Sequence, residues 1–123
     1  MGTTIPLKDL EVYKISHNLG NEVWKIVSNW SQFERDTLGV QLVKSIDSVS
    51  LNICEGHGRY FFKDKRLFFY YSRGSLYEAE ECLIKAYKRN LIIEEEYINI
   101  LASIRNLSVK LNNLITSLNK AAS

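Results

Sequence analysis

The stretch LNICEGHGR, residues 51–59, ends one apolar helical segment and separates it from the next. It places Asn52 and Glu55 three residues apart and therefore on one helix face, and two glycines and an arginine follow. A second unusual string, SRGS at 72–75, interrupts the next apolar segment, with Glu78 one turn later. Polar groups and glycines in core-like helices reduce stability. The polar residues of the two strings are therefore expected to have hydrogen-bonding partners or a functional role.

Apolar residues recur every three or four positions along most of the chain, which predicts four successive helices. The first helix is expected to end near Trp30, and Ser31–Glu34 has the Ser-x-x-Glu form of a capping box that starts the second. The third is expected over about residues 64–89, and the fourth opens with the carboxylates at 94–96. Asn90, between them, tolerates the left-handed conformation that often follows a helix.

Short connections between long helices make neighbouring helices antiparallel. No segment shows the alternating pattern of a strand, and no linker or repeat divides the chain. The fold class expected is therefore all-α, an antiparallel up-down-up-down four-helix bundle. We expect one domain over residues 1–123, with a short N-terminal tail at 1–6 and a C-terminal tail at 120–123.

Composition favours an ordered protein, with 46% hydrophobic residues, 24% charged residues and one proline. The net charge of +2 neither requires nor excludes a nucleic-acid partner. No apolar run approaches the roughly 18 residues that a membrane span needs, and the N-terminus lacks the features of a signal peptide. Cys54 and Cys82 are expected as small buried residues of a reducing compartment, with a disulfide as the alternative. These features predict a cytoplasmic protein without a membrane partner.

The third predicted helix is apolar on two sides, although a monomeric bundle needs one stripe per helix. One side is small and the other large, and three tyrosines add further aromatic surface. The residues are Ser75, Ala79, Cys82 and Ala86 on the small side, Phe69, Leu76, Leu83 and Tyr87 on the large side, and Tyr70, Tyr71 and Tyr77. The excess indicates either a wide buried face with partly exposed tyrosines or a subunit interface, where aromatic residues are enriched.

Several motifs together match one family. They are DLEVY at 9–13, Gln41, NICEG at 52–56, Gly58-Arg59, Arg73-Gly74-Ser75 and Glu78. On these residues the chain resembles, over about residues 7–119, the four-helix-bundle proteins encoded in intervening sequences of bacterial 23S ribosomal RNA genes. That family is related to the accessory variability determinant proteins of diversity-generating retroelements.

The resemblance implies a homo-oligomer in the form of a five-membered (pentameric) ring of bundles. For the retroelement relatives it also implies binding of a reverse transcriptase and of nucleic acid. For the intervening-sequence members it implies no settled biochemical activity. The chain departs from the pattern at Phe61 and Phe62, where the family often has Ser or Thr, and at Asn90, where it often has Gly.

Five polar residues of the two unusual strings are predicted to form a structural network between two helices. They are Asn52, Glu55, Arg73, Ser75 and Glu78. In this interpretation Arg73 bridges Glu55 or Glu78, and removing one member leaves an uncompensated charge. The alternative is a site in which the two carboxylates act as acid and base. No nucleophile with a paired base accompanies them, so we expect no catalytic residue and no enzyme.

Two basic clusters are candidates for nucleic-acid binding. They consist of Arg59, Lys63, Lys65 and Arg66, and of Lys85, Lys88 and Arg89. Aromatic residues at 60–62 interleave with the first cluster and are suited to stack on bases. The alternative is an ordinary solvated loop whose aromatic residues close the end of the bundle.

His17 and His57 lack a second His or Cys at ligand spacing, so neither a metal nor a cofactor is expected. Gly56 and Gly58 lack the preceding strand and the longer glycine pattern of a phosphate loop, and are expected to form a sharp turn between helices. The function expected is a non-enzymatic oligomeric module that binds RNA, DNA or a nucleic-acid enzyme such as a reverse transcriptase through basic surfaces. The alternative is a purely structural or protein-interaction oligomer without nucleic-acid binding.

Overall fold

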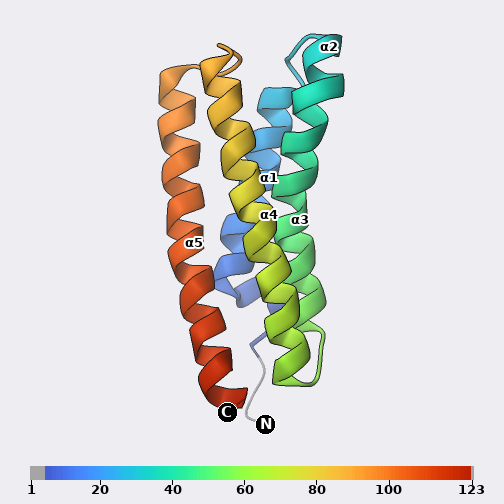
Figure 1. Cartoon of the computed structure of the whole chain (residues 1–123), viewed down its shortest axis with the longest axis vertical. Coiled ribbons are helices and arrows are strands. Elements are labelled where there is room, and N and C mark those ends of the chain that lie inside the picture. The colour runs from blue at the N-terminus through green and yellow to red at the C-terminus, as the bar shows by residue number, and fades with distance from the viewer. Residues whose placement is uncertain (1–4, 123) are drawn as a thin grey trace.

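A computed structural model describes residues 5–122 and shows four long helices joined by short connections (Figure 1). The elements are η1 (Leu7–Asp9), α1 (Glu11–Val27), α2 (Gln32–Glu34), η2 (Arg35–Gly39), α3 (Val40–His57), α4 (Phe62–Lys88) and α5 (Glu94–Ala122). Helix α4 lies in front in Figure 1, with α3 and α5 on either side and α1 behind. The described part of the chain contains no strand, so the prediction of an all-helical bundle is confirmed.

The connection between α1 and α3 starts at the predicted capping box, which is present. Ser31 Oγ accepts a hydrogen bond from the Glu34 backbone N–H, and the Glu34 carboxylate accepts one from the Ser31 N–H. The next turn, η2, is a π-turn, in which the Val40 N–H donates to the carbonyl of Arg35. Thr37 Oγ1 donates to the Phe33 carbonyl at 2.7 Å, and such back-bonding often bends a helix.

The connection between α4 and α5 follows the predicted left-handed residue. Asn90 has φ 61°, the only positive φ of a residue other than glycine between residues 5 and 122. The Leu91 N–H donates to the Ala86 carbonyl and the Asn90 N–H to the Tyr87 carbonyl, which is the Schellman pattern. The Trp30 indole N–H donates to the Leu91 carbonyl at 3.0 Å and so ties this connection to the end of α1.

Two boundaries differ from those expected. Helix α1 ends at Val27, so Trp30 lies in the connection, where its buried ring closes this end of the bundle. Helix α5 continues through Ala122, so residues 120–122 form its last turn and not a tail.

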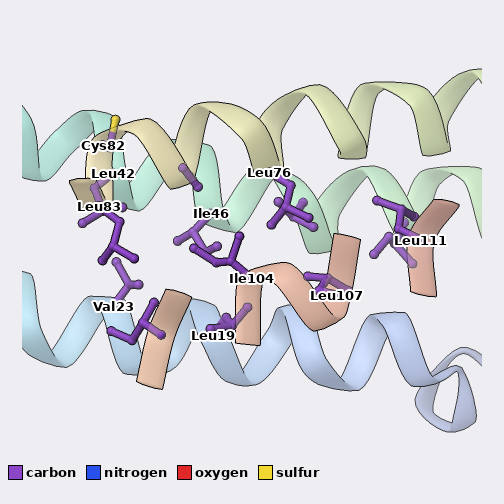
Figure 2. Close-up of a cluster of buried hydrophobic side chains, with 14 of the residues drawn as sticks. Leu19, Val23, Leu42, Ile46, Leu76, Cys82, Leu83, Ile104, Leu107 and Leu111 are labelled. Carbon is purple, nitrogen blue, oxygen red and sulfur yellow. The ribbon is translucent and has the colours of Figure 1, made fainter. Parts of the chain in front are cut away.

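The core is formed by one apolar stripe from each long helix, and these stripes meet along the bundle axis (Figure 2). The labelled members are Leu19 and Val23 of α1, Leu42 and Ile46 of α3, Leu76, Cys82 and Leu83 of α4, and Ile104, Leu107 and Leu111 of α5. Both cysteines are free, with Cys82 buried and Cys54 half-buried. Burial raises the pKa of each thiol, which keeps it protonated and unreactive.

Gly56 corrects one expectation, because it is not a turn residue. It lies buried in the last turn of α3, and no glycine in the described chain has a positive φ. A Cβ at this position would stand 3.1 Å from the Lys65 carbonyl oxygen and 3.1 Å from Phe68 Cβ. The glycine therefore allows α4 to approach α3 closely.

Asp47 of α3 predicts a dependence of stability on pH. Burial raises the pKa of its carboxyl, and the charge of His17 offsets part of this increase. Because the folded-state pKa is raised, the folded state binds the proton more tightly than the unfolded chain. The stabilisation is thus fully present below the ordinary Asp value of about 3.8 and is lost as the pH rises through the raised folded value.

We therefore expect Asp47→Asn to melt at a higher temperature than the parent protein at pH 7, with the difference shrinking at pH 3. Thermal unfolding followed by circular dichroism at both pH values measures this. Asp36→Asn, at an exposed position, is the matched control. A lower melting temperature for Asp47→Asn at pH 7 would show that the ionised carboxylate makes a stabilising contact.

Candidate functional site

The seam between α3 and α4 contains a small polar network. Asn52 Nδ2 donates to the Ser48 carbonyl at 2.9 Å and contacts Ser48 Oγ at 3.0 Å. Ser75 Oγ of α4 donates to Ser48 Oγ at 2.9 Å. One turn away, the fully buried Ser72 donates to the Val49 carbonyl at 2.8 Å. The two bonds that cross from α4 to α3 fix the register of these helices. No buried polar side-chain atom in the described chain lacks a partner.

Only two of the five predicted network residues, Asn52 and Ser75, belong to this seam. Glu55 forms an exposed ion pair with Arg59, which lies just past the end of α3, at 2.5 Å. Arg73 donates to Asn112 Oδ1 of α5 at 3.2 Å, with its guanidinium 4.9 Å from the Tyr70 ring centroid. The predicted bridge from Arg73 to Glu55 or Glu78 is therefore wrong, because Arg73 turns towards α5.

Glu55 and Glu78 are not brought together either. The bond between Ser48 and Ser75 sets these residues level, and numbering falls along α3 as it rises along α4. Glu55 is then level with about residue 68, ten residues from Glu78, or about 15 Å at 1.5 Å per residue. This separation does not suit an acid–base pair.

Sequence reasoning missed three residues of these contacts, namely Ser48, Ser72 and Asn112. Ser48 precedes Asn52 by one turn, and Ser72 begins the SRGS string, so both carried a recognisable signal as small polar residues in apolar helices. Asn112 carried no such signal, because its pairing with Arg73 depends on how α5 lies against α4.

The first basic cluster divides into two exposed and two structural cations. Lys65 Nζ donates to the His57 carbonyl at 2.9 Å, which caps the end of α3, and burial lowers the pKa of this lysine. Arg66 donates to Asn119 Oδ1 of α5 at 3.1 Å. Arg59 and Lys63 are exposed, and Arg59 stands 4.6 Å from the Phe68 ring centroid.

Exposed aromatic rings accompany Arg59 and Lys63 at this end of the bundle. Tyr60 and Phe61 both face solvent and meet edge to face, with ring centroids 4.9 Å apart. Two exposed cations beside two exposed rings are the components from which single-stranded nucleic-acid sites are built. We call Arg59, Tyr60, Phe61 and Lys63 the turn cluster.

The second basic cluster lies at the opposite end of α4. Lys85, Lys88 and Arg89 are all exposed around the helix C-terminus. Residues 63 and 85 of one continuous helix stand about 33 Å apart at 1.5 Å per residue. The two clusters therefore cannot form one surface on a single chain.

The two-sided apolar character of α4 resolves into a buried and an exposed part. Leu76, Ala79, Cys82, Leu83 and Ala86 are all buried, so the small and the large side both face the bundle. Tyr71 and Tyr77 stay exposed, the latter with 60% of its surface accessible. Within one chain, α4 thus has a wide buried face and a separate aromatic surface.

No group of three or more His, Cys, Asp or Glu side chains between residues 5 and 122 is placed to hold a metal ion. In the same part of the chain, no helix has the length and apolarity to cross a membrane.

Comparison with known proteins supports the fold. Residues 8–113 match the sequence model of the family described as "23S rRNA-intervening sequence protein". A crystal structure of a protein of unknown function from the S23 ribosomal protein family of Bacteroides thetaiotaomicron superposes with a TM-score of 0.76, covering 85% of this chain and 97% of that chain at 17% identity. At this identity the likeness shows the fold alone. Among curated proteins, none matches the chain.

Proposed function

Because the chain belongs to the 23S rRNA-intervening sequence protein family, we propose that it is a non-enzymatic module that binds nucleic acid as a homo-oligomer. In this proposal the long helices form an antiparallel up-down-up-down bundle, and five bundles assemble into a ring. The observation that supports nucleic-acid binding is the turn cluster, in which Arg59 and Lys63 flank the exposed rings of Tyr60 and Phe61.

A ring would repeat the turn cluster once per subunit. Two cations and two rings form a weak site, but several such sites on one particle bind a single strand with avidity. The cluster at Lys85, Lys88 and Arg89 would form a second basic zone at the other end of the ring. A nucleic-acid enzyme such as a reverse transcriptase is the protein partner that this arrangement suits, in the manner of the retroelement accessory proteins that the chain resembles. We place this activity in the cytoplasm.

A purely structural or protein-interaction oligomer is the second candidate. The exposed tyrosines of α4 favour it, since aromatic residues are enriched at protein interfaces. Light scattering on a column, with the 260/280 nm absorbance ratio recorded in low and high salt, distinguishes the two. Bound nucleic acid that leaves in high salt supports the module, whereas a clean oligomer in both salts supports the scaffold.

The turn cluster makes a quantitative prediction. Replacing Arg59 and Lys63 by glutamine is expected to weaken binding of a single-stranded oligonucleotide. For every phosphate that a cation no longer neutralises, the slope of log K against log salt should fall by about 0.7. Fluorescence anisotropy over a range of salt concentrations measures this slope.

The matched control replaces the exposed Lys14 and Lys25 of α1 by glutamine, which removes the same charge from another face. Equally weakened binding in both double variants would show that affinity follows net charge and not the turn cluster. A melting temperature within a few degrees of the parent's for each variant excludes unfolding as the cause.

A further inference from the structure

An apolar groove of about 340 Å³ opens between the end of α1 and the start of α3. Trp24 and Val27 of α1 form one wall, and Gly39, Val40 and Val43 form the other. Trp24 has 62% of its surface accessible, an unusual exposure for the largest apolar side chain. Exposed apolar surface of this kind marks an interaction site.

The charged side chains that line this groove are both cationic. Lys44 forms no ion pair in the part of the chain that the structure describes, and Arg35 makes one long contact, 3.5 Å, to the Ser28 carbonyl. No carboxylate lines the groove. An occupant that matches it is therefore apolar or aromatic and carries carboxylates.

The solvent face of α4 has this chemistry. Positions three and four apart place Leu67, Tyr71, Gly74, Tyr77, Glu78 and Glu81 on one exposed strip, which we call the α4 ridge. A Cβ added at Gly74 would meet nothing within 4 Å, so no contact within the chain requires a glycine there. Glycine costs about 1 kcal/mol relative to alanine in a helix, and its benefit is the close approach of another backbone. Glu78 and Glu81 form no ion pair in the described chain.

The groove and the part of the ridge from Tyr77 to Glu81 lie at the same height on different sides of the bundle. The bonds from Ser75 to Ser48 and from Ser72 to Val49 fix which residues of α4 and α3 are level. By this register Glu78 is level with about residue 44, and Glu81 with about residue 41. Helix α4, which carries the ridge, lies in front in Figure 1 and α1 lies behind. The groove is lined by residues of α1, of α3 and of the connection between them, and by no residue of α4, so the two patches are separate surfaces.

Two different patches at one height meet between copies that are related by rotation without a shift along the axis. Such a head-to-tail contact closes into a ring when its rotation divides a full turn, whereas patches at different heights generate a filament. The start of α5 is the other acidic surface with exposed isoleucines. The ion pair of Arg105 with Glu80 sets residues 94–98 level with about 87–91 of α4, which is beyond the apolar part of the groove at residues 39–43.

We infer that the α4 ridge of one copy docks in the α1–α3 groove of the next copy. Tyr77 packs on Trp24, and Glu78 and Glu81 face Lys44 and Arg35. The backbone at Gly74 approaches the neighbouring copy just below the groove. The inference rests on the homo-oligomer of the proposed function and names the two surfaces that make it. A second copy is the occupant because the carboxylates of Glu78 and Glu81 on the ridge complement the cations of Lys44 and Arg35 in the groove.

Charge reversal tests the pairing. Lys44→Glu and Glu78→Lys are each expected to weaken self-association at least tenfold, and the double variant is expected to restore it. The mass from light scattering over a range of protein concentrations gives these values. Restored self-association in the double variant identifies the two residues as partners, because a folding defect caused by one substitution would not be repaired by the other. A side chain at position 74 extends into open space within one chain, so the Gly74→Leu variant is expected to fold. Its bulk is expected to keep the copies dissociated. Lys14→Glu is the charge control.

The outcomes separate the inference from the function on which it rests. A parent protein of 14.2 kDa in solution would overturn the proposed oligomer together with the pairing. An oligomer that survives both Lys44→Glu and Gly74→Leu would leave the proposed oligomer standing and overturn the assigned surfaces. Single variants that dissociate without rescue in the double variant would overturn the pairing, and would indicate a different partner for each patch.

Discussion

Replacing Ile46 by alanine is expected to lower the free energy of unfolding by about 2–5 kcal/mol, the range for a large aliphatic residue cut back in a packed core. Ile46 has no accessible surface and lies in the centre of the cluster drawn in Figure 2. The three carbon atoms removed leave a cavity among residues from different helices, and helix backbones cannot close it without disturbing the packing elsewhere. A single domain has about 5–15 kcal/mol in total, so the decrease is a large share of its stability.

Urea unfolding followed by circular dichroism measures this decrease. Leu51→Ala is the matched control, because Leu51 belongs to the same helix and has 66% of its surface exposed. We expect the control to remain within about 0.5 kcal/mol of the parent. If Leu51→Ala costs as much as Ile46→Ala, the face of α3 assigned to the core is wrong, or Leu51 is covered in an oligomer, which a dilution series would reveal.

Replacing Gly56 by valine is the second large effect that we expect, a destabilisation of about 1–3 kcal/mol or more from overpacking. The new Cβ alone would stand 3.1 Å from Phe68 Cβ, from Phe69 Cε1 and from the Lys65 carbonyl oxygen. A backbone oxygen and a Cβ atom move only with their helix, so α4 would have to shift away from α3. The shift would also strain the bond from Lys65 to the His57 carbonyl.

Gly58→Val is the matched control, two residues away in the same connection. The nearest atoms to a Cβ at Gly58 are backbone oxygens at 3.6 Å, an ordinary contact distance, and the residue is exposed. Its φ of −77° is one that any residue adopts. We expect a change within about 0.5 kcal/mol on chemical denaturation. Equal stability of both variants would mean that α3 and α4 do not approach closely at Gly56.

The helices were predictable because their signals are local. The apolar stripes of Ile46 and Leu107 point inward as the spacing requires. The capping box at Ser31–Glu34 and the left-handed Asn90 mark helix boundaries through contacts within a few residues in sequence. Such features depend on one segment alone, so periodicity and capping chemistry are sufficient to find them.

The candidate sites were predicted less well because they depend on how segments meet. Arg73 could reach carboxylates by spacing alone, but its partner is Asn112, 39 residues away on α5. The sequence alone indicates that Lys65 is a surface cation, but in the structure its Nζ donates to the His57 carbonyl and caps α3. The groove at Trp24 and Val40 is created by the position of α1 beside α3, which no local pattern encodes.

The burial of Trp30 and the exposure of Trp24 give the protein two built-in optical probes. Trp30 has 7% of its surface accessible and donates its indole N–H to the Leu91 carbonyl, 61 residues away, so its emission should be blue-shifted and should change on unfolding. Trp24 lies in solvent and should emit at longer wavelength and be quenched by iodide. In a Trp30→Phe variant, the remaining emission would report only on what covers α1. Folding and docking can thus be followed separately in one cuvette without a chemical label.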